Sequence, residues 1–354
     1  MSTMTNRQRL IAILQRQELD RVPFIQYDGL AAPTNEIWSV LGRANFGILS
    51  WVPAYRIETP NCTTTSEEIF RDGLRGIRNI IRTPAGSLEE EKLFEPTFGT
   101  ASIRKHYLTQ PSDYEILARY LKDMVITDNN NEINRVAAQI GEDGLPHAFV
   151  PRTPYQQLWV QWVSIEDLVY HMVDCPERVQ ECIDIMSAHF RQILEIAVRS
   201  PAPYICIPDN ITAPAIGRAN FDRYCLPLYR RAAELFPEDK RPVFVHMDGD
   251  LMPLWESIGA SGISGLDSLS PPPDNDTSVA QAAGMWPWMR IFVNFPSSVH
   301  LKPEDQIRQA ADRILAGAGH TGQLTIQISE NVPPGAWRRS FPIIARAIED
   351  FGKP

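Results

Sequence analysis

The chain has 354 residues, of which 44% are hydrophobic, and this is enough to bury one large core. Its 34 basic and 43 acidic side chains give a net charge of −9, so we expect neither nucleic acid nor an anionic membrane surface as a partner. The five cysteines form no C-x-x-C pair, and no segment reads as a signal peptide or a membrane span. These features exclude a disulfide framework and predict a reduced, cytoplasmic protein.

Proline is the one unusual count, with 29 residues against an average share of about 5%. The prolines are dispersed along the chain and many stand beside a short apolar run or at the start of a helical pattern. This placement predicts a single domain over residues 1–354 rather than a proline-rich linker.

The chain opens with a predicted helix, because Thr5 and Gln8 form a capping box before an amphipathic segment. Residues 21–27 then read as a short buried strand. Later helical patterns cover residues 164–173, 176–190, 221–236 with a break at Pro227, 301–315 and 337–351.

Seven short apolar runs are predicted to be parallel strands that alternate with helices. They lie at residues 21–27, 148–152, 204–207, 243–246, 263–266, 291–294 and 324–328. This alternation predicts a (β/α)8 TIM barrel with an N-terminal helical extension, although the eighth strand is not assigned. We expect additions and insertions to the barrel between residues 30 and 150, including a β-hairpin that turns at Pro84.

Polar residues that follow the predicted strands are the candidates for chemistry, because active sites of barrels lie at the carboxyl ends of the strands. The set is Tyr27, Asp28, Arg152, Asp209, Asn210, His246, Asp248, Asp267, Asn294, Glu330 and Asn331.

His246 and Asp248 are the most informative pair, since residues two apart on a strand project to the same face. Glu330 from another strand end would complete three protein ligands with an open position, as in a catalytic metal site. An imidazole with two carboxylates suits zinc, or a harder ion such as iron or manganese. The alternative is a hydrogen-bonded pair that fixes a loop.

The other candidates have weaker support. Asp209 and Asn210 could orient a substrate or donate a proton, but an ordinary Asx turn explains them equally well. The tryptophans at 159, 162, 286 and 288 could line a pocket or simply pack. Cys206 reads as a buried small hydrophobe, and His171, His189 and His300 as structural residues.

Several blocks, in their order along the chain, resemble the uroporphyrinogen decarboxylase superfamily. They are RQRLIAILQRQELDRVPF, PDNITAPAIGRANFDRYCLPLYRRAAELF, VFVHMDGD, LWESIGASGISGLD, RIFVNFPSSVHLKPEDQIRQAADRIL and ISENVPP. The resemblance covers residues 7–25 and 200–351 and implies the same barrel fold.

The resemblance also separates two branches. True uroporphyrinogen decarboxylases carry an R-Q-A-G-R segment after the first strand, whereas this chain has IQYDGLAAP, without arginine and with Asp28. An acidic pocket would repel a substrate with many carboxylates. The other branch contains zinc-dependent methyltransferases that work with corrinoid proteins, and its metal positions correspond here to His246, Asp248 and Glu330.

We therefore expect a methyltransferase that moves a methyl group from an oxygen-methyl substrate, such as a methoxyarene, to a corrinoid (cobalamin), carried by a partner protein. Zinc is the expected metal. Asp209, Asp28 and Asn210 are the expected catalytic residues, and Tyr27, Arg152, Trp159 and Asn294 the substrate-binding residues. The alternatives are a metal-dependent lyase that decarboxylates a small acid, and a barrel with a purely binding role.

Overall fold

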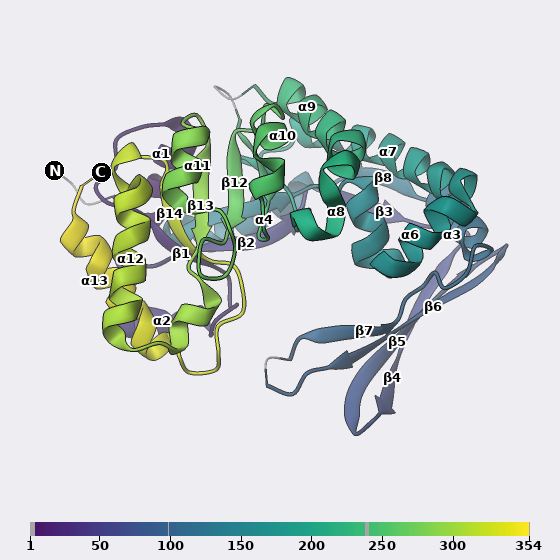
Figure 1. Cartoon of the computed structure of the whole chain (residues 1–354), viewed down its shortest axis with the longest axis horizontal. Coiled ribbons are helices and arrows are strands. Elements are labelled where there is room, and N and C mark those ends of the chain that lie inside the picture. The colour runs from purple at the N-terminus through teal and green to yellow at the C-terminus, as the bar shows by residue number, and fades with distance from the viewer. Residues whose placement is uncertain (1–3, 98, 238–240, 354) are drawn as a thin grey trace. The chain divides into compact units, whose positions relative to one another are not determined.

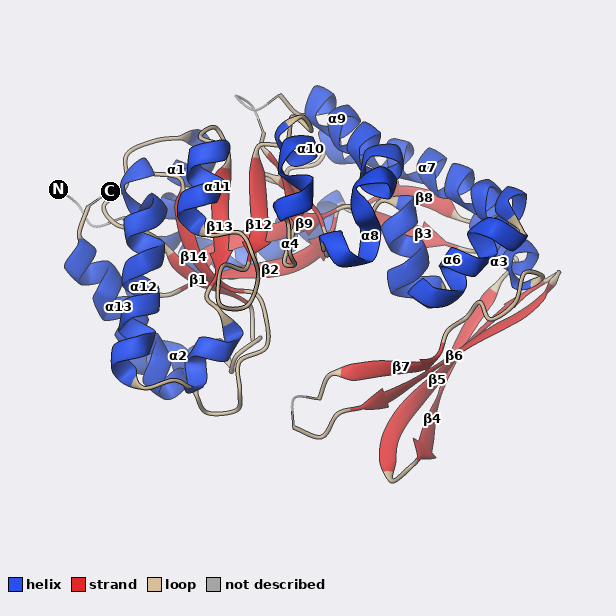
Figure 2. Cartoon of the chain, in the orientation of Figure 1, coloured by secondary structure: helices blue, strands red, loops and turns tan. Residues whose placement is uncertain are grey.

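Eight parallel strands close into a barrel in the computed structural model, which describes residues 4–97, 99–237 and 241–353 (Figures 1 and 2). The order around the barrel is β1-β14-β13-β12-β11-β10-β9-β2. The strands are β1 Phe24–Tyr27, β2 Gly47–Pro53, β9 Gly144–Phe149, β10 Ile205–Ile207, β11 Val243–His246, β12 Gly265–Leu269, β13 Arg290–Asn294 and β14 Leu324–Ile328. The closed parallel barrel with intervening helices confirms the predicted fold class.

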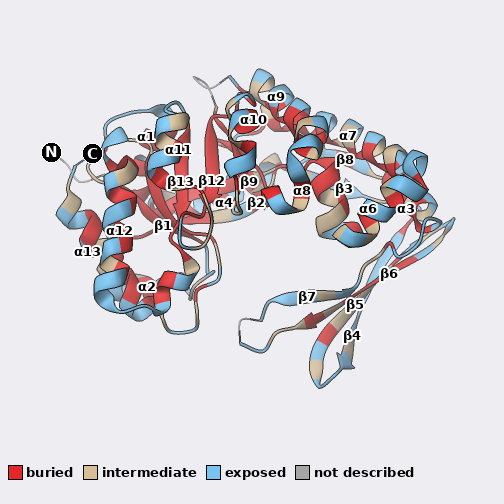
Figure 3. Cartoon of the chain, viewed as in Figure 1, coloured by how far each residue is buried: buried red, intermediate tan, exposed pale blue. Residues whose placement is uncertain are grey.

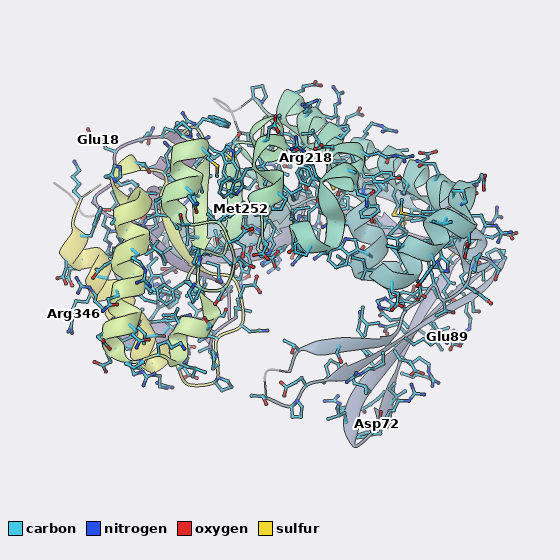
Figure 4. The ribbon with its side chains drawn as sticks, viewed as in Figure 1. Glu18, Asp72, Glu89, Arg218, Met252 and Arg346 are labelled. Atoms are coloured by element: carbon cyan, nitrogen blue, oxygen red, sulfur yellow. The ribbon has the colours of Figure 1, made fainter. Side chains whose placement is uncertain are left out.

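Helices connect these strands and cover them from outside. They are α1 Asn6–Gln15, α2 Thr34–Leu41, α4 Asn130–Ile140, α8 Ala213–Asn220, α9 Leu226–Leu235, α10 Trp255–Gly259, α11 Val279–Met285, α12 Glu304–Ala318 and α13 Trp337–Phe351. Short 3-10 or π turns lie at η1 Arg43–Asn45, η2 Gly141–Asp143, η4 Phe221–Cys225, η5 Met252–Leu254, η6 Ser297–Leu301 and η7 Gly319–Thr321. The strands are buried and the outer helix faces are exposed (Figure 3), where Arg218 of α8 and Arg346 of α13 project outward (Figure 4).

The strand missing from the sequence prediction is β2. It lies between β1 and β9, with Ile25 paired to Gly47 and Ile48 paired to Gly144. Because β2 and β9 both fall inside residues 30–150, the range that we assigned to additions is too wide. β2 was missed because it follows α2 and η1 after a short connection and contains Trp51 and Pro53, which blur its apolar pattern.

The predicted strands and helices are otherwise found with modest shifts of their bounds. The first strand begins at Phe24 rather than at residue 21, and β9 ends at Phe149 and begins four residues earlier than expected. The segment 221–236 is a π turn followed by α9, with Pro227 in the first turn of that helix, where a missing N–H is tolerated.

Helix α1 lies against the amino-terminal ends of the barrel strands. Its predicted capping box is present, with Thr5 accepting from the N–H of Gln8. Asn6 donates to the carbonyl of Phe46, just before β2, and the buried guanidinium of Arg290 at the start of β13 donates to the carbonyl of Leu14 at 2.6 Å. The second bond satisfies a backbone carbonyl at the C-terminal end of the helix, and together the two bonds fix the N-terminal extension to the barrel.

Contacts divide the chain into two compact units. All the barrel strands belong to the unit formed by Met1–Ala54, Asn129–Val150 and Ala197–Pro354, and the other unit comprises Tyr55–Asp128 and Pro151–Ile196. The single domain that we predicted means that both units fold together. A division by contacts does not test whether they do, so the single domain stays a prediction.

The second unit contains two antiparallel sheets and several helices. One sheet pairs β3 Tyr55–Glu58 with β8 Val125–Asp128, and the other has the order β4-β5-β6-β7. Its remaining elements are β4 Thr63–Arg71, β5 Leu74–Thr83, β6 Gly86–Phe94, β7 Ala101–Lys105, α3 Asp113–Lys122, α5 Pro154–Gln157, η3 Leu158–Trp162, α6 Ile165–Asp174 and α7 Pro176–Val198, which ends in the barrel unit. The turn between Thr83 and Gly86 confirms the predicted β-hairpin.

The five cysteines are all buried, and none is in a disulfide. No helix in the described part of the chain combines the length and apolarity that crossing a membrane requires.

Closure of the barrel through β2 can be tested at Gly144. A Cβ atom there would lie 1.8 Å from the carbonyl oxygen of Ile48 in β2, and backbone cannot move aside cheaply. We expect Gly144→Ala to lower the free energy of unfolding by more than about 3 kcal/mol. Gly284→Ala on helix α11 is the matched control, because its Cβ meets nothing within 4 Å, and it should change stability by less than about 1 kcal/mol. Urea denaturation of both variants measures this, and equal effects would contradict the observed β2–β9 register.

The fully buried His300 gives the barrel unit a pH dependence. Burial lowers the pKa of His300 to about 4, and its Nδ1 lies 2.7 Å from the hydroxyl of Ser340. Since the unfolded chain takes up this proton near pH 6.5, stability is lost as pH falls from about 6.5 to about 4, by an amount on the order of 3 kcal/mol. Urea denaturation between pH 7 and pH 4.5 should show a shallower loss for His300→Gln than for the unsubstituted protein. Identical slopes would show that His300 is not buried in its neutral form.

Candidate metal centre

Three predicted ligands meet at the carboxyl ends of the barrel strands. His246 is the last residue of β11, Asp248 follows two residues later, and Glu330 follows β14. The Nε2 atom of His246 lies 3.6 Å from Oδ2 of Asp248 and 3.7 Å from Oε1 of Glu330, and the three ligand atoms lie within 4.8 Å of one another. Although β12 and β13 separate β11 from β14, closure of the barrel turns both strand ends toward the same space.

The orientation of His246 is set by Asp267. These residues are paired across strands β11 and β12, and Oδ2 of Asp267 lies 2.9 Å from Nδ1 of His246. A proton on Nδ1, held by this carboxylate, leaves Nε2 facing Asp248 and Glu330. A carboxylate behind a ligating histidine is the usual support of a protein metal site, so the donor set fits a divalent ion.

The backbone of β12 bends where it presents Asp267. The register with β13 is irregular between Leu266 and Leu269, and Ser268 adopts a φ of +66°. This left-handed backbone conformation costs a residue other than glycine about 1–3 kcal/mol, and it persists only where surrounding contacts hold the residue. Here the hydroxyl of Ser268 bonds to that of Ser329 and lies 3.4 Å from Oε1 of Glu330. The irregularity therefore positions two residues of the site.

The two carboxylate ligands are also held by neighbouring amides. Asn210, with a φ of +53°, donates from Nδ2 to Oδ2 of Asp248 at 3.1 Å. The Oδ1 atom of Asn294 accepts from the backbone N–H groups of Ser329 and Glu330 at 3.1 and 3.2 Å. Both asparagines thus contact the ligands or their backbone and restrict their positions.

The carboxylates around His246 decide the electrostatics of the site. Burial acts to lower the pKa of His246, but its bonds with Asp248, Asp267 and Glu330 outweigh burial and raise that pKa well above its usual value. Burial acts to raise the pKa of Asp267, but His147, His246 and Tyr27 hold it near 2. The same negative groups that stabilise a proton on His246 would also stabilise a metal cation, so proton and metal would compete for this site.

Exposure increases across the three ligands. The side chain of His246 is 6% exposed, that of Asp248 22% and that of Glu330 36%. An ion held among them would be anchored from the buried side and would keep an open position toward the carboxylates and solvent, as in catalytic rather than structural sites.

The two aspartates predicted to be catalytic differ in their surroundings. Asp28 is exposed and accepts from the hydroxyls of Thr34 and Ser50. Asp209 is fully buried and accepts from the hydroxyl of Tyr229. Asp28 is therefore the more accessible of the two, and the predicted catalytic role of both residues stays a prediction.

The predicted substrate-binding residues are placed differently from one another. Tyr27 at the end of β1 is buried, and its hydroxyl donates to Asp267; Asn294 holds the backbone of Glu330 as described above. Arg152 and Trp159 lie in the second unit, where the amide of Gln157 donates to the carbonyl of Arg152 and the indole of Trp159 donates to Gln156. Their predicted role in substrate binding is untested.

Sequence reasoning missed the support given by Asp267 and gave no role to His147 or Tyr204. Asp267 was noted only as a strand end, although its pairing with the last residue of β11 follows from aligning the two strand ends. His147 fell outside the expected strand because β9 begins four residues before the predicted one.

The sequence Gly317 to Gly322, GAGHTG, has the spacing of a dinucleotide-binding loop but not its position. It lies at the C-terminal end of α12 and precedes β14. The dinucleotide loop instead follows a strand and opens a helix, so that the helix N-terminus faces the phosphates.

Comparisons with known proteins identify the family and the fold. The family model described as uroporphyrinogen decarboxylase (URO-D) matches residues 160–341. No curated protein matches the sequence. A solved methyltransferase from Methanosarcina mazei is similar in structure with a TM-score of 0.57 and 14% identity, covering 98% of this chain and 99% of that one. At this identity the likeness shows a shared fold.

Two further structures are much less similar. An endoglucanase of the GH5-4 type from an uncultured bacterium has a TM-score of 0.36 at 13% identity, covering 63% of this chain and 76% of its own. A D-psicose 3-epimerase has a TM-score of 0.30 at 7% identity, covering 66% and 84%. Neither bears on function.

The role of Asp267 gives a prediction for metal affinity. In Asp267→Asn the oxygen that bonds with both Tyr27 and His246 loses its negative charge and becomes a weaker acceptor, so the imidazole is held less firmly. We expect affinity for a divalent ion at His246 to fall about 10–100-fold, measured by competition with a chromogenic chelator. Asp312→Asn on the outer face of α12 is the control and should bind metal normally. Unchanged affinity in Asp267→Asn would show that His246 needs no such support.

Proposed function

Because the chain belongs to the uroporphyrinogen decarboxylase family, we propose that it is a metal-dependent methyltransferase that moves a methyl group from an oxygen-methyl substrate to a corrinoid acceptor. The observation that carries the proposal is the ligand set His246, Asp248 and Glu330, gathered at the carboxyl ends of the strands. Methoxyarenes are the substrate class that we favour, and zinc is the first candidate for the metal.

The chemistry of the ligands supports an oxygen substrate. Thiolate ligands make zinc electron-rich and suit the activation of a thiol, whereas one imidazole and two carboxylates leave a harder ion. When bound, the metal supplies a Lewis acid toward the ether oxygen, and the reduced corrinoid supplies the nucleophile for the methyl group. The protein then needs no nucleophilic side chain of its own.

The side chains of this protein would bind and orient. His246 would hold the metal from the buried side, and the more exposed Asp248 and Glu330 would hold it where a substrate oxygen can approach. Asp28, whose carboxylate is already ordered by Thr34 and Ser50, would accept a hydrogen bond from a substrate hydroxyl. A corrinoid protein as the partner that carries the acceptor belongs to the same proposal.

Decarboxylation is the second candidate, because the family takes its description from a decarboxylase. A polycarboxylate substrate is disfavoured, since the candidate site offers Asp248 and Glu330 and the segment after β1 carries Asp28 in place of arginine. A small acid that binds the metal through its carboxylate remains the form of this alternative. Carbon dioxide released without a corrinoid would favour it.

The first test is a screen of methoxylated aromatics with cob(I)alamin, using protein purified without an affinity tag and analysed for bound metals. We expect formation of methylcobalamin, followed by its absorbance, together with loss of activity on chelation and recovery on addition of zinc. A protein that holds no divalent metal and forms no methylcobalamin would make a binding role the better interpretation.

The ligand assignment predicts different results for two aspartates. Asp248→Ala should remove one equivalent of metal per chain and lower turnover at least 100-fold, because a ligand is lost. Asp28→Asn should retain all the metal and raise KM or lower kcat more modestly, about tenfold, because only substrate orientation is affected. Metal analysis and steady-state kinetics measure both. Unchanged metal content and turnover in Asp248→Ala would contradict the assignment.

A further inference from the structure

A second cluster of ligand-type side chains lies inside the barrel. His147 of β9, Cys206 of β10 and Asp267 of β12 are all completely buried. Their Nε2, Sγ and carboxylate oxygen atoms lie within 4.8 Å of one another. Only Asp267 also contacts the site described above, where it supports His246.

Two atoms of this cluster have no hydrogen-bond partner. The Nε2 atom of His147 and the Oδ1 atom of Asp267 are both buried without one. Leaving a buried polar atom unsatisfied costs about 1–3 kcal/mol, so an unpartnered Nε2 on His147, 3.9 Å from Oδ2 of Asp267, indicates a ligand between them.

The remaining contacts aim His147 into the cluster. Its Nδ1 atom lies 2.6 Å from the hydroxyl of Tyr204, so a proton on Nδ1 that is donated to Tyr204 leaves the lone pair of Nε2 facing Cys206 and Asp267. Burial, the largest influence, lowers the pKa of His147 to about 4, so the imidazole is neutral at neutral pH, which is the form that binds metals.

The spacing suits an ion. The Oδ2 atom of Asp267 lies 3.9 Å from Nε2 of His147 and 3.8 Å from Sγ of Cys206. Zinc bonds of about 2.0–2.3 Å at a tetrahedral angle place two donor atoms roughly 3.3–3.7 Å apart. Small side-chain movements would therefore bring all three donors into bonding distance of a single ion.

We propose that His147, Cys206 and Asp267 form a second, buried binding site for a thiophilic divalent ion of the zinc type. On binding, Cys206 releases its thiol proton to solvent and bonds as a thiolate, so the thiolate and the carboxylate together balance the charge of the ion. Asp267 then links the two sites, because Oδ2, the oxygen that faces His147 and Cys206, also bonds with Nδ1 of His246. The second ion stabilises the core of the barrel and holds Asp267 in place.

Cobalt(II) is the probe that separates the two sites, because only the second one contains sulfur. Metal-free protein titrated with Co²⁺ should bind two equivalents and develop the near-ultraviolet charge-transfer band of a cobalt–thiolate bond. Absence of that band in the unsubstituted protein would overturn the proposal and indicate a buried water in place of the ion.

Variants locate the band. Cys206→Ser and His147→Gln should each lower second-site affinity at least tenfold, and Cys206→Ser should abolish the band while one equivalent still binds. Asp248→Ala should lose the other equivalent and keep the band. Cys225→Ser, which changes another fully buried cysteine of the barrel unit, is the matched control and should keep both.

Two outcomes would place the thiolate elsewhere, namely a band that persists in Cys206→Ser or one that disappears in Cys225→Ser. The thermal unfolding midpoint of each variant shows whether that variant is folded. If a variant is unfolded, the presence or absence of the cobalt–thiolate band in the unsubstituted protein still tests the proposal. The cobalt–thiolate band does not depend on methyl transfer. The second site can therefore be wrong while the proposed function is right, and the proposed function can be wrong while the second site exists.

Discussion

The carboxylate of Asp267 is the interaction on which the candidate chemistry depends. Completely buried, it accepts from Tyr27 of β1 and bonds with His246 of β11, so it connects strands that are not neighbours in the barrel. A buried carboxylate is tolerable only where hydrogen bonds and positive charge compensate for lost hydration, and Asp267 meets that condition through the groups around it. The contact between Asp267 and Nδ1 orients the ring of His246, and so directs its Nε2 atom toward Asp248 and Glu330.

Backbone strain is concentrated around the same contact. Among the described residues only four other than glycine have a positive φ, and two of them, Asn210 and Ser268, touch the carboxylates of the metal centre. Strained backbone at residues that position ligands suits a preorganised site, because rigid ligands lose less entropy when a metal or a substrate binds.

The fold was largely predictable because its signals are local. The strand Val243–His246 and the helix Trp337–Phe351 have the predicted bounds, since burial of short apolar runs and amphipathic periodicity depend on neighbouring residues alone. β2 was not predicted, because its membership of the barrel depends on pairing with β1 and with β9, about a hundred residues away along the chain. The candidate metal ligands were predictable in part. Their position at strand ends is a local signal, and the family resemblance supplied the rest.

By itself, the sequence determined the barrel, the helix that covers its amino-terminal ends, and the gathering of His246, Asp248 and Glu330 at one edge. These follow from residue periodicity and from the rule that parallel strands end together. Only the tertiary structure decided the roles of individual side chains. In the structure the hydroxyl of Tyr229 donates to Asp209. Tyr27 donates to Asp267, and Asn294 accepts from the backbone of Ser329. The structure also brings His147, Cys206 and Asp267 together. The physical reason is that a hydrogen bond or a ligand contact depends on distances of a few tenths of an ångström across strands far apart in the chain, and no local pattern encodes them.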